Sequence, residues 1–320
     1  MGEVTAPTKI VLFSAVNSKF GAPVLDRLLT DPQISVEALV TSPAGQLCDY
    51  YVHDPQQVDL AATARAAGVC VMRPPKVNRD TVLVQLRQRR PDYFIIANYQ
   101  QIFSEALLGV PEVGTVNFHP SPLPRYAGLA PFFWMARNGE REGGVSAVWT
   151  TAGIDSGPLV AQRRLPLGGT ETSGEIVRSH FEASWHLVDE VLPTLIDRSL
   201  RLTDQDLRER SYYGRPGPQD QHAYLAAPTR EVLRTIRACC PDPGATLSTS
   251  DGNTLRVLEA EAIHSVPTGP WPQPGTLLEY DGQYLGRTAD GWIRLVRMIV
   301  SDAVLADCRR LDGNLALTGI

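Results

Sequence analysis

The chain has little lysine, and its cysteines do not follow a metal-binding pattern. Only Lys9, Lys19 and Lys76 are lysine, so arginine supplies 27 of the 30 basic residues. The five cysteines contain no CxxC pair, which argues against a zinc site and against the disulfide framework of small secreted domains. We therefore expect a reduced, cytoplasmic setting, with the adjacent Cys239 and Cys240 placed inside a helix.

A long apolar run is also missing. The longest one near the N-terminus covers residues 10–16, far short of the ~20 residues that a membrane span needs. The 320 residues are 43% hydrophobic and 20% charged, a composition typical of globular proteins of about two domains. The net charge of −5 argues against broad affinity for nucleic acid or anionic membranes. We expect neither as a partner.

Strands and helices alternate along the first two hundred residues. Short apolar runs rich in branched residues, typical of buried strands, alternate with segments whose apolar residues recur at helical spacing. The predicted strands cover residues 10–16, 36–40, 69–72, 93–97 and 115–118, and the predicted helices cover 20–29, 59–67, 80–89 and 105–108. This alternation predicts an α/β fold over residues 1–205, a Rossmann-like parallel sheet with helices on both faces.

The pattern changes after about residue 203. Brief alternating runs at 255–258, 276–280, 284–287 and 292–298 follow a short amphipathic helix at 230–239. Asp251-Gly252, Asp281-Gly282 and Asp290-Gly291 stand before or between these runs, and Asp-Gly is a strong signal for a β-hairpin turn. Residues 206–320 are therefore predicted to form a second domain, a small OB-like β-barrel.

The residues best suited to chemistry follow the strand predicted at 115–118. Asn117 and His119 are two positions apart, so their side chains share one face, at the strand end where open α/β sheets bind ligands. Asp155 lies between Gly153 and Gly157, in a loop that allows close backbone approach. An amide and a protonated imidazole could stabilise an oxyanion while a carboxylate relays a proton, as acyl transfer to nitrogen requires. Spacing alone leaves a structural histidine and an ordinary turn as alternatives.

Three segments together resemble the signature of the 10-formyltetrahydrofolate-dependent formyltransferase family. They are Asn117-Phe118-His119-Pro120-Ser121, Leu123-Pro124-Arg125-Tyr126 with Gly128, and Gly153-Ile154-Asp155-Ser156-Gly157-Pro158-Leu159. By this resemblance Asn117, His119 and Asp155 match the catalytic triad of the family, and N10-formyltetrahydrofolate is the formyl donor. The resemblance implies no metal. It continues through residues 213–216, 236–238, 243–245 and 274–276, and so covers nearly the whole chain.

The resemblance also implies a folate pocket built from two loops. Members of the family line the pteridine pocket with the loop after the strand predicted at 93–97, largely through backbone groups. The implied cofactor-binding residues are Asn98, Tyr99, Gln100, Gln101 and Ile102 in that loop, and Gly153 and Ile154 beside Asp155. One departure is Val148, which stands where the family commonly has a second histidine. It leaves the triad complete but leaves the acceptor specificity open.

Charge bears on the acceptor of the formyl group. From residue 201 onward the chain holds 13 arginines, no lysine and 15 acidic residues, a net charge of −2. Binding of tRNA needs positive charge for the phosphates. We therefore expect the acceptor to be an amine or hydroxylamine of a small molecule, such as hydroxyornithine or a nucleotide-linked amino sugar.

Three alternatives to this function stay open. They are a methionyl-tRNA formyltransferase, a formyltetrahydrofolate hydrolase in which water replaces the amine, and a non-catalytic folate-binding paralogue. The last would be expected to lose a triad residue, and all three are present. The sequence leaves the oligomeric state open, a dimer included.

Overall fold

The chain forms two compact units, each assembled from separate stretches of sequence. The computed structural model describes residues 6–48, 51, 56–248, 254–264, 272–280, 282–299 and 317–318. The first unit contains residues 1–128, 144–165 and 180–212, and the second contains 129–143, 166–179 and 213–320. The predicted fold class is confirmed: a mostly parallel sheet with helices is followed by an antiparallel β domain. The domain boundary at residue 205 and the cytoplasmic location stay predictions.

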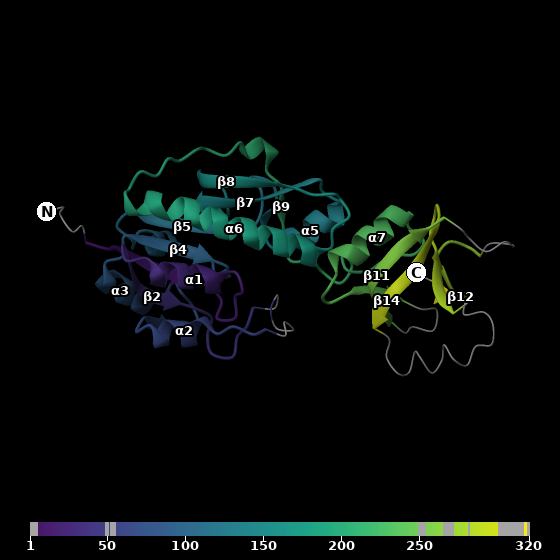
Figure 1. The fold of residues 1–320 in the computed structure, drawn as a ribbon, viewed down its shortest axis with the longest axis horizontal. Helices are drawn as coiled ribbons and strands as arrows, with labels where there is room; N and C mark the ends of the chain where they lie inside the picture. The colour runs from purple at the N-terminus through teal and green to yellow at the C-terminus, as the bar shows by residue number, and fades with distance from the viewer. Residues whose placement is uncertain are drawn as a thin grey trace. The chain divides into compact units, whose positions relative to one another are not determined.

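The first unit is built on a seven-stranded sheet with the order β3-β2-β1-β4-β5-β7-β8 (Figure 1). Its strands are β1 (Thr8–Phe13), β2 (Ile34–Val40), β3 (Cys70–Met72), β4 (Tyr93–Ala97), β5 (Gly114–His119), β7 (Glu142–Trp149) and β8 (Leu159–Pro166). The strands from β3 to β5 are parallel, whereas β7 runs antiparallel to β5. The predicted parallel sheet is therefore present, with an antiparallel addition at one side.

Helices cover both faces of this sheet. They are α1 (Gly21–Thr30), α2 (Leu60–Ala66), α3 (Asp80–Arg89), α4 (Glu105–Leu108) and the long α6 (Ser173–Ile196), which begins in the second unit. Ile10 and Leu12 of β1 belong to a core with α1, α2 and α6, whereas Val11 and Phe13 belong to a core with α3 and α4. The alternation of side chains along a buried strand therefore builds two cores from one apolar run.

The strand order reverses between β1 and β4. In open α/β sheets, ligands bind at the carboxyl ends of the strands next to such a reversal. Asn98 follows β4 at this edge, and its carbonyl oxygen accepts a hydrogen bond of 2.8 Å from the Ala15 N–H, which lies just after β1. His119 is the last residue of the neighbouring β5. The topology thus places the predicted folate loop and the predicted catalytic strand at one edge of the sheet.

The second unit carries a six-stranded antiparallel sheet with the order β10-β11-β14-β13-β12-β15. Its strands are β10 (Ala245–Ser248), β11 (Thr254–Ile263), β12 (Thr276–Tyr280), β13 (Gln283–Arg287), β14 (Trp292–Ile299) and β15 (Leu317–Thr318). Helices α5 (Pro131–Asn138) and α7 (Thr229–Ala238) belong to the same unit. Asp290-Gly291 turns the chain between β13 and β14 as predicted, while Asp251-Gly252, Asp281 and Cys308 lie outside the described residues.

The cysteine pair lies at the end of α7 rather than inside it. Cys239 is the C-terminal cap residue of the helix and Cys240 follows it, and both thiols are free and buried. Burial raises the pKa of the Cys239 thiol to about 12, which makes it a structural apolar residue rather than a reactive one. Among the described residues, no helix is long and apolar enough to cross a membrane.

Candidate active site

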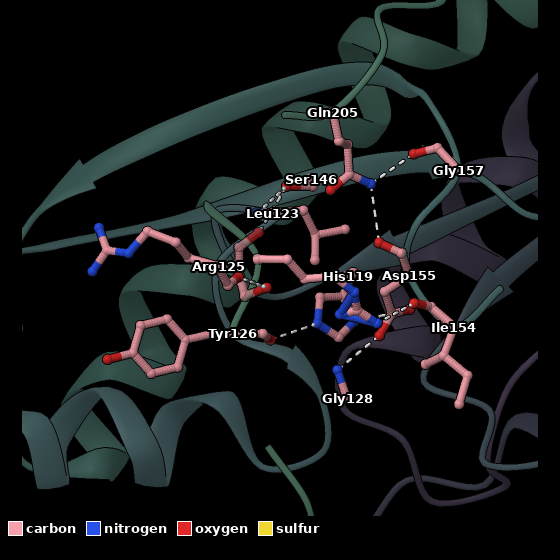
Figure 2. A network of polar contacts seen from close by, with 12 residues as sticks. His119, Leu123, Arg125, Tyr126, Gly128, Ser146, Ile154, Asp155, Gly157 and Gln205 are labelled. Atoms are coloured by element: carbon pink, nitrogen blue, oxygen red, sulfur yellow. Dashed lines mark hydrogen bonds and ion pairs between the residues drawn. The ribbon is translucent and has the colours of Figure 1, made fainter. Parts of the chain in front are cut away.

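The backbone of the following loop fixes the imidazole of His119. His119 is 7% exposed, and its Nε2 lies 3.2 Å from the carbonyl oxygen of Tyr126. A carbonyl oxygen can only accept a hydrogen bond, so Nε2 carries a proton and donates it. In the neutral ring the lone pair is therefore on Nδ1. Nδ1 faces the Asp155 carboxylate, with 3.8 Å to Oδ1 (Figure 2).

Asp155 lies in the loop between β7 and β8, with its side chain 12% exposed. Its Oδ2 accepts a hydrogen bond of 2.9 Å from the Gly128 N–H, which leaves Oδ1 directed at His119 (Figure 2). The residue adopts a φ of +49°, in the left-handed region that non-glycine residues rarely occupy. Such conformations persist only when surrounding contacts hold them, and they are frequent at functional sites.

Gly157 is needed for this loop to form. A Cβ atom added at this position would overlap with the carbonyl oxygen of Trp149, which is backbone and cannot move aside. The carbonyl oxygen of Gly157 also accepts a hydrogen bond from Gln205 (Figure 2). A side chain at position 157 would therefore push the Asp155 loop away from β7.

Replacing Gly157 with alanine is expected to lower the free energy of unfolding by ~1–3 kcal/mol and to lower kcat, because the Asp155 loop must shift away from Trp149. Urea unfolding and steady-state turnover measure the two effects. Gly214→Ala is the matched control, since no atom lies within 4 Å of a Cβ added there. Equal stability of the two variants would contradict the requirement for glycine.

Asn117 completes the set on β5. Val116 and Phe118 point into the core that includes α1 and α6, so the alternating Asn117 and His119 lie on the other face of the sheet. Asn117 is half-buried, and no described residue hydrogen bonds with its side chain. Its amide therefore keeps an N–H donor for a ligand, beside the imidazole.

The loop between β5 and α5 is held by a residue that the sequence did not single out. The Ser146 hydroxyl, on β7, donates to the Ser121 carbonyl at 2.7 Å and accepts from the Leu123 N–H at 3.2 Å (Figure 2). Val148, on the same strand, is 1% exposed and packs with apolar neighbours that include Leu123. The position where the family commonly has a histidine is thus part of an apolar cluster in this chain.

The side chains of the predicted folate loop are largely used to hold the loop itself. The Asn98 amide, at φ +63°, donates to the Ser18 hydroxyl at 3.1 Å, and Gln101 Oε1 accepts from the Val77 N–H at 2.8 Å. Tyr99 packs edge-on against Phe13, and burial raises the pKa of its hydroxyl. Ile102, at 66% exposed, points away from the core.

The backbone N–H groups of this loop are left available. No described residue accepts a hydrogen bond from the backbone N–H groups of residues 99–102. These N–H groups can donate hydrogen bonds to the acceptor atoms of a heterocycle, as expected for a pocket that binds its ligand through backbone groups. In the other loop, Gly153 and Ile154 precede Asp155, and Ile154 is 41% exposed. No hydrogen bond or ion pair joins residues 98–102 to His119 or Asp155 in the described part of the chain.

Comparison with known proteins gives the family. Residues 8–192 match the model of the formyl transferase family, and residues 218–304 match the model of its C-terminal domain. This chain belongs to the formyl transferase family. The predicted class of enzyme, a formyl-group transferase, is therefore confirmed.

Proteins similar to this formyl transferase differ in their names and in the molecules bound to them. It is 33% identical over 230 residues to the methionyl-tRNA formyltransferase of Anaeromyxobacter dehalogenans, a match that spans 72% of this chain and 73% of the relative. An N-formyltransferase structure from Helicobacter canadensis, in complex with folinic acid and dTDP-3-aminofucose, shares the fold with a TM-score of 0.66 and 16% identity over 92% of this chain and all of that one (100%). HypX from Aquifex aeolicus, in complex with tetrahydrofolic acid, aligns with a TM-score of 0.63 and 18% identity over 97% of this chain and 45% of that chain.

Proposed function

We propose that the enzyme transfers the formyl group of N10-formyltetrahydrofolate to an amine of a small molecule, with Asn117, His119 and Asp155 as its catalytic residues. The observation that carries this proposal is the pairing of His119 Nδ1 with Asp155 Oδ1 at 3.8 Å, beside the Asn117 amide on the same strand. A donor amide, an imidazole with one fixed proton and a carboxylate are the groups that acyl transfer to nitrogen uses.

The reaction forms one bond and breaks one. The acceptor nitrogen attacks the formyl carbon, and the carbon–N10 bond to tetrahydrofolate then breaks. Asn117 donates a hydrogen bond to the oxyanion of the tetrahedral intermediate, a contact of a kind whose removal typically costs about 10²–10³-fold in rate. The amine loses one proton and N10 gains one. His119 Nδ1 and Asp155 take up the first proton and deliver the second, while Tyr126 keeps Nε2 in place.

The folate would be held by the two predicted loops. The free N–H groups of residues 99–102 would bind the acceptor atoms of the pteridine ring, with Gly153 and Ile154 on the other side. The folate supplies the formyl group in its activated form on N10. Support comes from the folate ligands in the structures of H. canadensis N-formyltransferase and HypX.

Two observations support a small-molecule acceptor. Residues 201–320 have a net charge of −2, which disfavours a phosphate-binding surface for tRNA. The H. canadensis enzyme, bound to an amino-sugar nucleotide, aligns with 92% of this chain. Methionyl-tRNA is the second candidate acceptor, and it is favoured by the 33% identity to the A. dehalogenans enzyme.

A panel of acceptors, scored by tetrahydrofolate release, tests the proposal. We expect turnover with nucleotide-linked amino sugars or N-hydroxyornithine, and little with charged initiator tRNA. Repeating the assay at increasing salt concentration separates tRNA from small-molecule acceptors. Turnover of a tRNA substrate falls steeply as ionic strength rises, whereas turnover of a small amine does not. Strong, salt-sensitive turnover with tRNA alone would contradict the small-molecule acceptor. Formate release without any acceptor would instead identify a hydrolase.

A further inference from the structure

The chain segment after α6 returns to hold the Asp155 loop. The Nε2 of Gln205 donates one hydrogen bond to the Asp155 carbonyl oxygen at 3.0 Å and another to the Gly157 carbonyl oxygen at 2.6 Å (Figure 2). Both protons of one amide are thus used on two carbonyls of the same tight loop. The Oε1 atom of Gln205 is buried and has no hydrogen-bond partner in the described part of the chain. The side chain is therefore placed for its two donors.

The same segment makes further contacts with the two loops of the site. Nη2 of Arg210 donates to the carbonyl oxygen of Ile154 at 2.7 Å, so three of the four carbonyls from residue 154 to 157 are held from this side. Ser211 accepts a hydrogen bond of 2.9 Å from the Tyr126 N–H through its hydroxyl. Tyr126 is the residue whose carbonyl orients His119. Both partners of the His119–Asp155 pair thus depend on contacts made by Gln205, Arg210 and Ser211.

We propose that Gln205, Arg210 and Ser211 position the two loops of the site for formyl transfer, and that Gln205 is the positioning residue for Asp155. The inference rests on the proposed function, because it takes Asp155 as a catalytic group. Asp155 is held at φ +49°, a conformation that a non-glycine residue leaves when its contacts are removed. Loss of the two Gln205 hydrogen bonds would let the loop relax and move Oδ1 away from His119 Nδ1.

The chemistry of the contact explains why an amide stands at this position. Two carbonyl oxygens face Nε2, so the side chain must offer two donors. Methionine would match glutamine in length and shape but would leave both carbonyls without a partner. Glutamate would oppose them with a negative charge when ionised, and it would offer a single donor when protonated. Glutamine, methionine and glutamate therefore differ in the hydrogen bonds that they can donate to the two carbonyls, with little change in side-chain volume.

The first experiment measures kcat and KM of Gln205→Met and Gln205→Glu. We expect Gln205→Met to lower kcat by up to ~10²-fold, the effect of a misplacement of about 1 Å, with KM for donor and acceptor within about 2-fold of wild type. Gln205→Glu should lose more, and its kcat relative to wild type at the same pH should recover as the pH is lowered. Arg208→Ala is the matched control, because this guanidinium is 90% exposed and bonds only to Asp206 among the described residues. Its kcat should stay unchanged.

A double-mutant cycle then separates positioning from general stability. If Gln205 acts through Asp155, Gln205→Met should cause no further loss of kcat in the Asp155→Asn background. Losses that multiply, or a wild-type kcat for Gln205→Met, would overturn the inference. A wild-type kcat for Asp155→Asn would instead overturn the proposed function. If Gln205→Met does not fold, Gln205→Asn, which is too short to reach both carbonyls, provides the test. The kcat of Gln205→Asn should lie below that of wild type. In the Asp155→Asn background, Gln205→Asn should cause no further loss of kcat.

Discussion

Replacing His119 with alanine is expected to lower kcat by ~10²–10⁴-fold, the usual contribution of a positioned general acid or base. The variant loses the only group near Asp155 Oδ1 that the described structure offers as its ion-pair partner. It also loses the proton carrier whose tautomer Tyr126 fixes. Steady-state release of tetrahydrofolate measures the effect. Binding of the folate donor, measured by calorimetry, should persist, because no hydrogen bond or ion pair joins the described residues 98–102 to His119.

His186→Ala is the matched control for this experiment. His186 is an exposed residue of α6, and no described residue hydrogen bonds with its ring. A second variant, His119→Gln, restores a donor toward the Tyr126 carbonyl but cannot take up a proton. It should remain as slow as His119→Ala if proton transfer is the main role of the imidazole. Turnover near the wild-type rate in either His119 variant would remove His119 from the mechanism.

Local sequence patterns predict the bounds of a helix or strand wherever one hydrophobic periodicity continues without interruption. Helix α3 begins at Asp80 and ends at Arg89, and strand β4 covers Tyr93–Ala97, both as predicted. The strand predicted at 10–16 ends earlier, at Phe13. There the chain leaves the ladder, since Ser14 bonds to the carbonyl of Val40 and Ala15 bonds to that of Asn98. The bend toward the strand reversal is a tertiary feature, and an apolar run gives no sign of it.

Strand β7 and helix α6 were not predicted, because each contains residues that are untypical of its type of secondary structure or of a buried position. Strand β7 contains Gly143 and Gly144, which are poor strand formers, and a Cβ on Gly144 would overlap with the carbonyl of Arg163 in the neighbouring strand. Helix α6 places Ala183, Leu187, Val191 and Leu195 at four-residue spacing in the core, but polar His180 and Ser184 are buried along the same helix. The four-residue spacing of the apolar residues is the sequence signal of this helix, and the buried polar residues interrupt it.

The candidate site divides in a similar way. Asn117, His119 and Asp155 could be singled out because these side chains lie in short motifs with recognisable chemistry. Gln205 and Ser146 could not, because their roles come from hydrogen bonds to backbone atoms far away in the chain. Gln205 and Asp155, for example, are 50 positions apart. A side-chain amide can donate to a backbone carbonyl from any position in the sequence that the fold brings close to it. Only the structure shows which position this is.

Replacing Asp155 with asparagine is expected to be as damaging as the loss of His119, although it changes almost no volume. The asparagine carbonyl oxygen can still accept the Gly128 N–H, now bonded to Oδ2 at 2.9 Å, so the loop should keep its place. That orientation turns the amide nitrogen toward His119 Nδ1, where Oδ1 lies at 3.8 Å in the wild type. An N–H donor would then face the nitrogen that takes up a proton in the proposed mechanism, and would hold the ring in its neutral form.

We therefore expect Asp155→Asn to lower kcat by up to ~10⁴-fold, as carboxylate-to-amide changes beside a catalytic histidine can do. Thermal unfolding should stay close to that of wild type, because the bond to Gly128 is kept. Asp189→Asn is the control, since this carboxylate is 58% exposed and pairs with Arg27 at the protein surface. A loss of stability without a loss of kcat would mean that Asp155 only shapes its loop. A large loss of kcat at unchanged stability means that the charge itself, aimed at Nδ1 by the Gly128 bond, drives the proton transfers on which formyl transfer depends.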